Sequence, residues 1–329
     1  MVRQAHLRYL ENQLCWGTES FQCLEFLRMI FPMIGNENLM WTCCGRDIDC
    51  ADKTLVMGIL NVTPDSFSDG GKFYAPRRGF RAKTKNLKKA LARALQMVEE
   101  GADIIDIGGE STRPGAKPVR ASEEMERTVP LIGKLREQSD CLISIDTRKA
   151  EVARAAVSAG ADIINDVSAC SDPEMAAVAA ETGAGLVLMH MQGSPEIMQD
   201  NPQYKDVVST VRNFLEERME AAVSQGVLPQ QIALDPGIGF GKTDEHNLAL
   251  LNEIGELAAA GRPVLIGVSR KSLFGRLLGR EVDERLAVSL AAAVFSVMRG
   301  AHVLRVHDVK ESCDAARLVD TLRFQGLRE

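Results

Sequence analysis

Short apolar runs alternate with longer segments rich in Ala, Leu, Glu, Arg and Lys along most of the chain. Runs of this length, bounded by glycine and polar residues, are typical of strands buried on both faces, whereas the longer segments have the composition of helices. Strands are predicted near residues 55–60, 104–107, 142–145, 163–164, 186–189, 232–234, 264–268 and 303–306. Eight parallel strands alternating with helices predict the α/β fold of a (β/α)8 TIM barrel, and an open doubly wound sheet is the alternative.

A short phrase recurs where a predicted helix meets the next strand. It reads EGADIID from Glu100, AGADIIN from Ala159, TGAGLVL from Thr182 and RGAHVLR from Arg299. Glycine readily adopts the left-handed conformation that ends a helix, and the apolar residues after it begin a buried strand. The repetition therefore supports a parallel β/α architecture.

Polar side chains follow every predicted strand, at the end of the barrel where a TIM-barrel active site lies. They are Asn61, Asp106, Asp146, Asn165, Asp166, His190, Asp235, Ser269, Arg270, Lys271, Arg305, His307 and Asp308. One such residue alone is more often a loop cap or a surface charge. Their presence after all the strands predicts a single polar site at this end.

Length and charge limit what surrounds the barrel. We expect residues 40–329 to form the barrel domain and residues 1–39, which lack the pattern, to form a short N-terminal extension. That extension is either an accessory helix or the result of an upstream start, with Met40 as the natural first residue. The net charge of -6 argues against binding to nucleic acid or an anionic membrane, although a local basic pocket remains compatible with it.

The cysteines predict a cytoplasmic protein. None of the eight cysteines forms a C-x-x-C pair, and the tight group of Cys43, Cys44 and Cys50 has no histidine nearby, which disfavours a structural zinc site. Without a secretory signal, reduced thiols are expected. The apolar stretch at residues 21–34 is interrupted by charges and is too short to span a membrane.

Two loops contain residues suited to binding a metal ion, a diphosphate or an aromatic acid. Residues 57–71 read MGILNVTPDSFSDGG, so Asn61 with an acidic residue has the oxygen atoms to hold Mg²⁺ while the loop covers a diphosphate. Residues 108–116 read GGESTRPGA, in which Thr112 and Arg113 are able to bind an anionic aromatic acid. Ordinary turns are the alternative for both loops.

Three further strand-end residues, Asp146, Asn165 and Asp235, are suited to the donor edge of a ring. A carboxylate accepts two parallel hydrogen bonds from an N–H/NH2 edge, and capping of nearby loops is the alternative. After Asp235 the chain reads DPGIGFGKT, but Pro236 stands where a P-loop needs glycine, which excludes a nucleotide triphosphatase. We expect its glycines to let the backbone approach a flat ligand, with Phe240 stacking on that ligand or packing in the protein.

Cationic residues follow the last two strands of an otherwise acidic protein. Residues 269–272 read SRKS and residues 305–308 read RVHD. Lys, Arg and His donors neutralise the charge on a leaving diphosphate, so the two segments predict an anion clamp, with a surface salt-bridge network as the alternative. A Ser-His-Asp hydrolase is disfavoured because the chain has no G-x-S-x-G motif.

The motifs MGILNVTPDSFSDGG, GGESTRPGA, ISIDT, NDV, DPGIGFGK, SRKS and RVHD, in this order, resemble the signature series of the dihydropteroate synthases. The resemblance covers the chain from about Trp41 to its C-terminus. It implies condensation of 6-hydroxymethyl-7,8-dihydropterin diphosphate with 4-aminobenzoate to give 7,8-dihydropteroate and diphosphate, assisted by Mg²⁺. It also implies a dissociative mechanism, a folate-biosynthetic role and a homodimer, for which the small-residue helix predicted at 286–298 offers a packing face.

The resemblance further implies roles for single residues. The substrate-binding set would be Phe67, Thr112, Arg113, Asp146, Asn165, Met189, Asp235, Phe240, Lys271, Ser272, Arg305 and His307. The catalytic residues would be Asp146, Lys271, Arg305 and His307. Asn61 would hold the metal ion. Within the substrate-binding set, the diphosphate would lie on Arg305 and His307, and the aminobenzoate on Ser272 and the two loops.

Two other functions share much of this pattern. A corrinoid-dependent methyltransferase acting on methyltetrahydrofolate would share the pterin-holding Asn and Asp, but it has no diphosphate to expel and so no need of SRKS and RVHD. A paralogue that binds pterin without turnover would keep every motif. One departure from the family is a basic insertion between Pro76 and Leu87, which we interpret as solvated surface rather than part of a lid.

Overall fold

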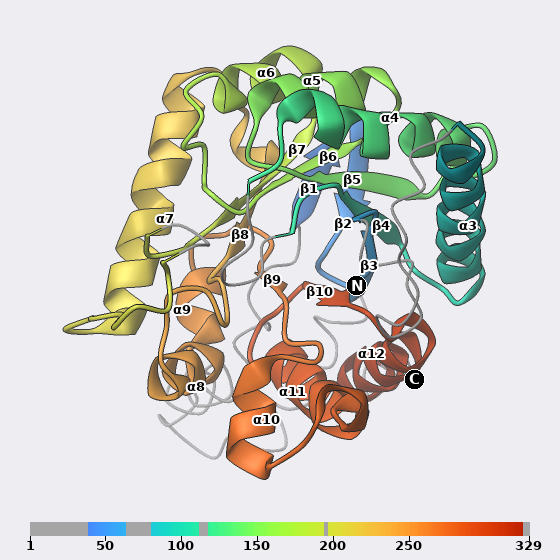
Figure 1. Cartoon of the computed structure of the whole chain (residues 1–329). Helices are drawn as coiled ribbons and strands as arrows, with labels where there is room; N and C mark the ends of the chain where they lie inside the picture. Colours follow the sequence, from blue (N-terminus) through green and yellow to red (C-terminus); the bar gives the residue numbers. More distant parts are fainter. Residues whose placement is uncertain (1–38, 64–79, 112–117, 194–196, 325–329) are drawn as a thin grey trace, which may run out of the picture.

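The computed structural model describes residues 39–63, 80–111, 118–193 and 197–324, and these form a parallel β/α barrel (Figure 1). Its strands are β3 (Leu55–Asn61), β4 (Ile104–Gly108), β5 (Leu142–Asp146), β6 (Ile163–Asp166), β7 (Gly185–Met189), β8 (Ile232–Asp235), β9 (Leu265–Ile266) and β10 (Val303–Val306). They pair in the order β8-β7-β6-β5-β4-β3-β10-β9. A parallel bridge between Leu234 and Val264 joins the two ends of this sheet, so the sheet closes.

Helices surround the strands on the outside (Figure 1). They are α3 (Phe80–Glu99), α4 (Ala121–Arg136), α5 (Ala150–Ser158), α6 (Met175–Thr182), α7 (Val207–Ser224), α8 (Asp244–Asn252), α9 (Ile254–Ala258), α10 (Ser272–Leu278), α11 (Leu286–Met298) and α12 (Val309–Phe324), with 3-10 turns at Pro229–Gln231 and Val282–Glu284. Outward-facing strand residues such as Ile105 and Ile143 pack on small helix residues such as Ala94 and Ala153. This aliphatic layer is the larger of the two hydrophobic cores.

The TIM-barrel prediction is confirmed, and the open-sheet alternative is wrong because the sheet closes on itself. Most strands match the predicted runs to within two residues. The seventh strand is shorter than predicted: only Leu265 and Ile266 form it, although Val264 adds the closing bridge. The apolar residues on either side of β9 are buried but form no further strand pairing. The length of the apolar run therefore predicted a longer strand than the one observed.

The recurring phrase has a structural role at each strand entry. Gly101, Gly160, Gly183 and Gly300 all have positive φ, at 105°, 113°, 71° and 113°. In three copies the residue after Gly-Ala accepts a hydrogen bond from a backbone N–H beside it: Asp103 Oδ2 from Val56 (2.9 Å), Asp162 Oδ2 from Ile143 (2.8 Å) and His302 Nδ1 from Val264 (3.1 Å). The phrase thus ends a helix and ties the new strand to its neighbour.

A β-hairpin that the sequence pattern did not predict closes the N-terminal end of the barrel. It consists of β1 (Met40–Cys43) and β2 (Arg46–Asp49), and its Trp41 is fully buried with Nε1 donating to Gln231 O at 2.8 Å. The hairpin packs against inward-facing residues from every barrel strand: Leu55, Met57, Ile104, Leu142, Ile163, Val187, Ala233, Leu265 and Val303. A Cβ at Gly185 would lie 2.5 Å from Cys43 Sγ, which explains the glycine in the third copy of the phrase.

Other expectations concern the surroundings of the barrel. Residues 1–38 lie outside the described residues, so the predicted extension is not described. The end of the basic insertion falls in the first turns of α3, where Lys88 and Lys89 are exposed, in agreement with solvated surface. Among the helices that are described, none combines the length and apolar character needed to cross a bilayer.

Candidate active site

The interior of the barrel changes from apolar to polar along the strands. Inward-facing positions alternate with outward-facing ones, so Ile104 and Asp106 face the axis while Ile105 faces the helices. Towards the carboxyl ends these inward positions bear Asp106, Ser144, Asp146, Asn165, Asp235 and Arg305, all buried or nearly so. Buried polar groups are costly unless they are paired, which makes this end of the barrel the candidate site.

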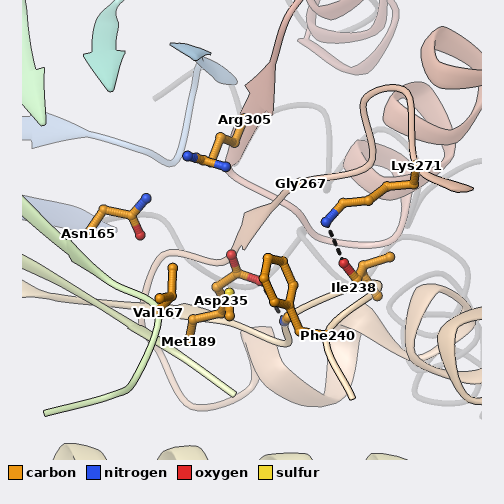
Figure 2. A pocket seen from close by; sticks show the side chains of 10 residues that line it. Asn165, Val167, Met189, Asp235, Ile238, Phe240, Gly267, Lys271 and Arg305 are labelled. Carbon is orange, nitrogen blue, oxygen red and sulfur yellow. Dashed lines mark hydrogen bonds between the residues drawn. The ribbon is translucent and has the colours of Figure 1, made fainter. Parts of the chain in front are cut away.

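A pocket opens among these residues (Figure 2). It is lined by Asn165, Val167, Met189, Asp235, Gly237, Ile238, Phe240, Gly267, Lys271 and Arg305. Oxygen acceptors, two cations and apolar side chains therefore surround one small space. Such a mixture suits a flat, polar, heteroaromatic ligand.

Arg305 is held between two carboxylates on neighbouring strands. Its Nε donates to Asp106 Oδ2 and its NH2 group to Asp146 Oδ2, both at 2.6 Å. Asn165 Nδ2 also donates to Asp106 Oδ2, at 3.2 Å, which leaves the Asn165 oxygen for a ligand. The pKa of Arg305 is raised, because these carboxylates outweigh the lowering effect of burial. The guanidinium is therefore a permanent, fixed cation beside the pocket.

Two acidic groups of the site, Asp146 and Asp235, have raised pKa values. Burial raises the pKa of Asp146 to about 7, although Arg305 opposes the rise and Asp106 adds to it. Burial also raises the pKa of Asp235, against the hydrogen bond that Gly237 N donates to its Oδ1 at 2.7 Å. One oxygen of Asp235 is thus engaged by the backbone, and the other is available to accept from a ligand.

Lys271 lies at the N-cap of α10, where the preceding Arg270 adopts a left-handed φ of 55°. Its Nζ donates to Ile238 O at 2.6 Å and lies 4.5 Å from the centre of the Phe240 ring (Figure 2). Burial lowers the pKa of Lys271 to about 8, with Asp235 opposing this and Arg305 adding to it. Arg270 itself forms an ion pair with Asp308, which joins the segments after β9 and β10.

The glycine-rich loop after β8 encloses its own lysine. Gly237, Gly239 and Gly241 all have positive φ, and a Cβ at Gly237 would lie 1.9 Å from His190 O. Lys242 is buried, and its Nζ donates to Gly237 O at 3.0 Å and to Phe240 O at 2.9 Å. A P-loop lysine must reach outward to phosphates, so this geometry confirms that the loop is not one.

His307 and Ser269 form a pair at the ends of the last two strands. Ser269 Oγ lies 3.1 Å from His307 Nδ1 and accepts from His307 N at 3.2 Å. Burial lowers the pKa of His307 to about 4, and Arg305 and Arg270 lower it further. The imidazole is therefore neutral near pH 7, so it offers a hydrogen bond rather than a positive charge.

Comparisons with known proteins agree with this geometry. The family model described as "Pterin binding enzyme" matches residues 57–307. The dihydropteroate synthase of Synechocystis sp. is 46% identical over 276 residues, which cover 83% of this chain and 92% of the relative. The chain belongs to the dihydropteroate synthase family. Solved dihydropteroate synthase structures from Xanthomonas albilineans agree, one with 4-aminobenzoic acid (TM-score 0.78, 44% identity) and one with 7,8-dihydropteroate (TM-score 0.74, 40% identity); each covers 87% of this chain and 99% of that structure.

As a member of the dihydropteroate synthase family, the chain brings most of the sequence-predicted residues together. Six of them line the pocket: Asn165, Met189, Asp235, Phe240, Lys271 and Arg305. Asp146 contacts Arg305 directly, whereas His307 contacts Ser269 and Ser272 is exposed at the start of α10. Phe67, Thr112 and Arg113 lie outside the described residues.

Several residues of this dihydropteroate synthase site were not in the predicted catalytic, substrate-binding or metal-binding sets, although Asp106 had been placed at a strand end and Gly237 in the loop expected to approach the ligand. They are Asp106, Val167, Gly237, Ile238, Lys242 and Gly267. Asp106 had a usable signal, because it occupies the same place in the recurring phrase as Asn165, and both side chains face the barrel axis. The apolar lining residues had none, since nothing in a single sequence separates them from ordinary core.

The dihydropteroate synthase resemblance implies Mg²⁺, and Asn61 is the residue assigned to it. The Oδ1 atom of Asn61 lies 3.2 Å from where a Cβ on Gly108 would be, and Asp146 Oδ2 lies 3.7 Å from the same point. The absence of a side chain at Gly108 thus leaves space beside Asn61 Oδ1, whereas Asp146 Oδ2 is already engaged by Arg305. The described residues contain no group of three His, Cys, Asp or Glu side chains placed to hold a metal ion. A site with one or two protein oxygens fits Mg²⁺, which takes its remaining ligands from substrate phosphates and water.

Proposed function

We propose that this chain condenses 6-hydroxymethyl-7,8-dihydropterin diphosphate with 4-aminobenzoate, giving 7,8-dihydropteroate and diphosphate. The observation that carries the proposal is the pocket itself, in which the acceptors Asn165 and Asp235 face the cations Lys271 and Arg305. The 46% identity to a dihydropteroate synthase over most of the chain supports the same conclusion. A corrinoid methyltransferase expels no diphosphate, so it would not need the cations Lys271 and Arg305.

Pterin recognition would use the two available oxygens of the pocket. The second oxygen of Asp235 and the amide oxygen of Asn165 accept hydrogen bonds from the N–H and NH2 groups of the ring. Lys271 donates to a ring acceptor from the opposite side, while Met189 and Phe240 contact the faces of the ring. A ligand lacking the donor edge would leave a buried carboxylate unpaired, so selectivity for this edge is high.

The chemical step exchanges one bond for another at the pterin methylene carbon. The carbon–oxygen bond to diphosphate breaks, the bonding electrons leave with diphosphate, and the cation that remains is stabilised by the ring. The amine nitrogen of 4-aminobenzoate then bonds to that carbon and one proton is released. Arg305 and Lys271, together with the His307 hydrogen bond, stabilise the departing anion; bound Mg²⁺, held by Asn61, would add charge neutralisation there.

Catalysis of this kind needs fixed charges more than a reactive side chain. Arg305 is locked by Asp106 and Asp146, and Lys271 by Ile238 O, before any substrate arrives. Such preorganised groups do not have to reorient as charge develops. No covalent intermediate with the protein is required.

The test is product formation by purified protein given the pterin diphosphate and Mg²⁺, with and without 4-aminobenzoate. Diphosphate release and a product with the mass of dihydropteroate are expected only when the amine is present. Binding of the pterin without turnover would instead identify a non-catalytic paralogue, and no binding would show that the site assignment is wrong. A matched Asp235→Asn variant should lose turnover while it keeps its fold.

We also propose that the protein is a homodimer in the cytoplasm. The helix α11 exposes Phe295, and the adjacent α12 exposes Leu318 and Leu322, so this side of the barrel offers apolar surface for a second copy. All six described cysteines are free thiols, which agrees with a reducing compartment. Light scattering at micromolar concentration is expected to give twice the monomer mass, and a monomer would refute the dimer.

A further inference from the structure

The ammonium group of Lys242 lies inside the wall of the pterin pocket, and its role is not explained by the chemistry above. Its side chain is 2% exposed. Around Nζ lie His190 Nδ1 at 3.0 Å, His190 O at 3.3 Å, Gly237 O at 3.0 Å and Phe240 O at 2.9 Å. The N–H groups of Lys242 Nζ thus have four acceptors within reach, and none of these acceptors is a carboxylate oxygen. Burial lowers the pKa of Lys242 to about 7, although Asp235 opposes the shift. The amine is therefore held mainly by these uncharged acceptors, and such a buried arrangement suggests a positional role for Lys242.

The four acceptors belong to two separate walls of the pocket. His190 directly follows Met189, which lines the pocket from β7, whereas Gly237 and Phe240 belong to the loop after β8. Lys242 therefore joins the Met189 wall to the wall that contains Ile238 and Phe240. Both walls flank the space assigned to the flat ligand (Figure 2).

His190 has the right protonation state for this role. Burial lowers its pKa to about 3, and the nearby Lys242 lowers it further, so the ring is neutral near pH 7. In the tautomer with the proton on Nε2, Nδ1 accepts a hydrogen bond from Lys242 Nζ. The ring is also fixed by an edge-to-face contact with Phe214, at 4.9 Å between centroids. His190 is therefore fixed on the β7 side of the pocket, and Lys242 connects the glycine-rich loop to it.

The loop in turn positions a catalytic group. Lys271 donates to Ile238 O and lies over the Phe240 ring, so its place depends on the loop that Lys242 holds. The backbone of this loop has little conformational preference of its own because Gly237, Gly239 and Gly241 all have positive φ. Hydrogen bonds to the surrounding protein hold it in one conformation, and those of Lys242 to Gly237 O and Phe240 O are the ones that reach its pocket-lining part from inside.

We infer that Lys242 is a positioning residue for pterin binding: with His190 it sets the spacing between the Met189 and Phe240 walls and thereby the place of Lys271. The inference rests on the proposed function and deepens it. Lys242 is inferred to contact neither substrate. Because it positions the walls of the pterin pocket, loss of its side chain should weaken binding of the pterin diphosphate more than binding of 4-aminobenzoate.

The test compares Lys242→Met with Tyr204→Phe. Tyr204 Oη donates to Gly241 O at 2.7 Å, on a residue that does not line the pocket, so Tyr204→Phe is the matched loss of one bond to the same loop. For Lys242→Met we expect the KM for the pterin diphosphate to rise about 10- to 100-fold, the effect of losing several buried hydrogen bonds at once. The KM for 4-aminobenzoate should change by less than about threefold, and Tyr204→Phe should change neither by more than that.

A purely structural role would lower the active fraction without moving either KM, and that result would overturn the inference. If Lys242→Met does not fold, His190→Phe replaces it: an aromatic ring remains beside Phe214 and the backbone acceptor His190 O is kept, whereas the ring nitrogens, including the Nδ1 acceptor, are lost. A pterin KM raised by about three- to tenfold is then expected, and an unchanged KM would refute the inference. Failure of the wild-type protein to turn over would refute the proposed function instead, so the two failures are distinguishable.

Discussion

Arg305 joins a group of buried polar side chains at the pocket end of the barrel. It lies between Asp106 and Asp146, and Asn165 donates to the same Asp106 oxygen. The other oxygen of Asp106 has no hydrogen-bond partner among the described residues, although it is fully buried. Each member of the group holds another member in place, so a single change should affect both catalysis and stability.

We predict that Asp106→Asn lowers kcat/KM by about 10-fold or more, because Arg305 loses one of its two negative partners and gains freedom to move. Unfolding in urea should show a loss of about 1–3 kcal/mol for the weakened buried group. Glu123→Gln, a change at an exposed partner of Arg127 on α4, is the control and should leave both values nearly unchanged. Activity of Asp106→Asn within twofold of wild type would contradict the role.

We predict that kcat/KM for the pterin diphosphate falls as the pH rises above about 8. Burial lowers the pKa of Lys271 to about 8, so its charge is present below that pH and is lost as the pH rises through it. The measurement is a pH–rate profile of the wild type beside Lys271→Arg, whose residual activity should not fall in this range because arginine stays charged. A profile that is flat up to pH 9.5 in the wild type would be evidence against a charged Lys271.

At the level of residues, the sequence predicted those with distinctive chemistry and missed those whose role depends on packing. Asp235 and Lys271 stand out because polar residues after apolar runs are informative. Val167 and Ile238 are indistinguishable from core, and Lys242 had a functional interpretation only as a false P-loop. Its true place depends on His190, 52 positions away, a contact that no local pattern contains.

At the level of elements, the recurring Gly-Ala phrase ends a helix and begins the next strand. The residue after Gly-Ala then bonds that strand to its neighbour. His302 occupies this place before β10, where it is buried and accepts from Val264 N. Burial lowers the pKa of His302 to about 3, and Arg323 contributes. Its imidazole is neutral in the folded protein and gains a proton on unfolding below about pH 6.5.

His302→Asn should therefore cost stability at neutral pH but less in acid. With the folded pKa below the unfolded one, the wild type keeps its full stability above about pH 6.5 and loses it as the pH falls, by up to about 1.4 kcal/mol per unit. Asparagine keeps an acceptor and does not titrate. The gap between the two proteins, measured by thermal unfolding from pH 7.5 to 5, should narrow, and a constant gap would contradict the neutral imidazole.

The barrel strands were predictable because each is an apolar run with a glycine before it and a polar residue after it. The hairpin was not, since β2 reads RDID and is mostly exposed, so it lacks the apolar run of a buried strand. Its place is determined by Trp41 and by the space above Gly185. These are contacts between residues far apart in the chain, and they appear only once the barrel has closed.

At the level of the whole molecule, the two ends of the barrel have separate tasks. The hairpin end is apolar and contains Trp41, whereas the pocket end is polar and contains the chemistry. We predict that Trp41→Ala lowers the free energy of unfolding by about 3–5 kcal/mol, because it leaves a large cavity under all the strands. The kcat of the protein that remains folded should stay within about twofold of wild type.

Leu228→Ala is the control for this prediction, since Leu228 is 59% exposed and should shift stability by no more than about 0.5 kcal/mol. Urea unfolding and steady-state kinetics at low temperature, on the same preparations, make the comparison. A collapse of kcat in Trp41→Ala together with a small stability change would show that the two ends are coupled.

The hairpin has one more consequence. Among the described residues, Trp41 and its apolar neighbours fill the N-terminal end of the barrel, so a ligand reaches the pocket from the carboxyl ends of the strands. If two ligands occupy this end of the barrel one above the other, the inner ligand has to enter before the outer one and leave after it. An outer ligand that binds first would then block the inner position.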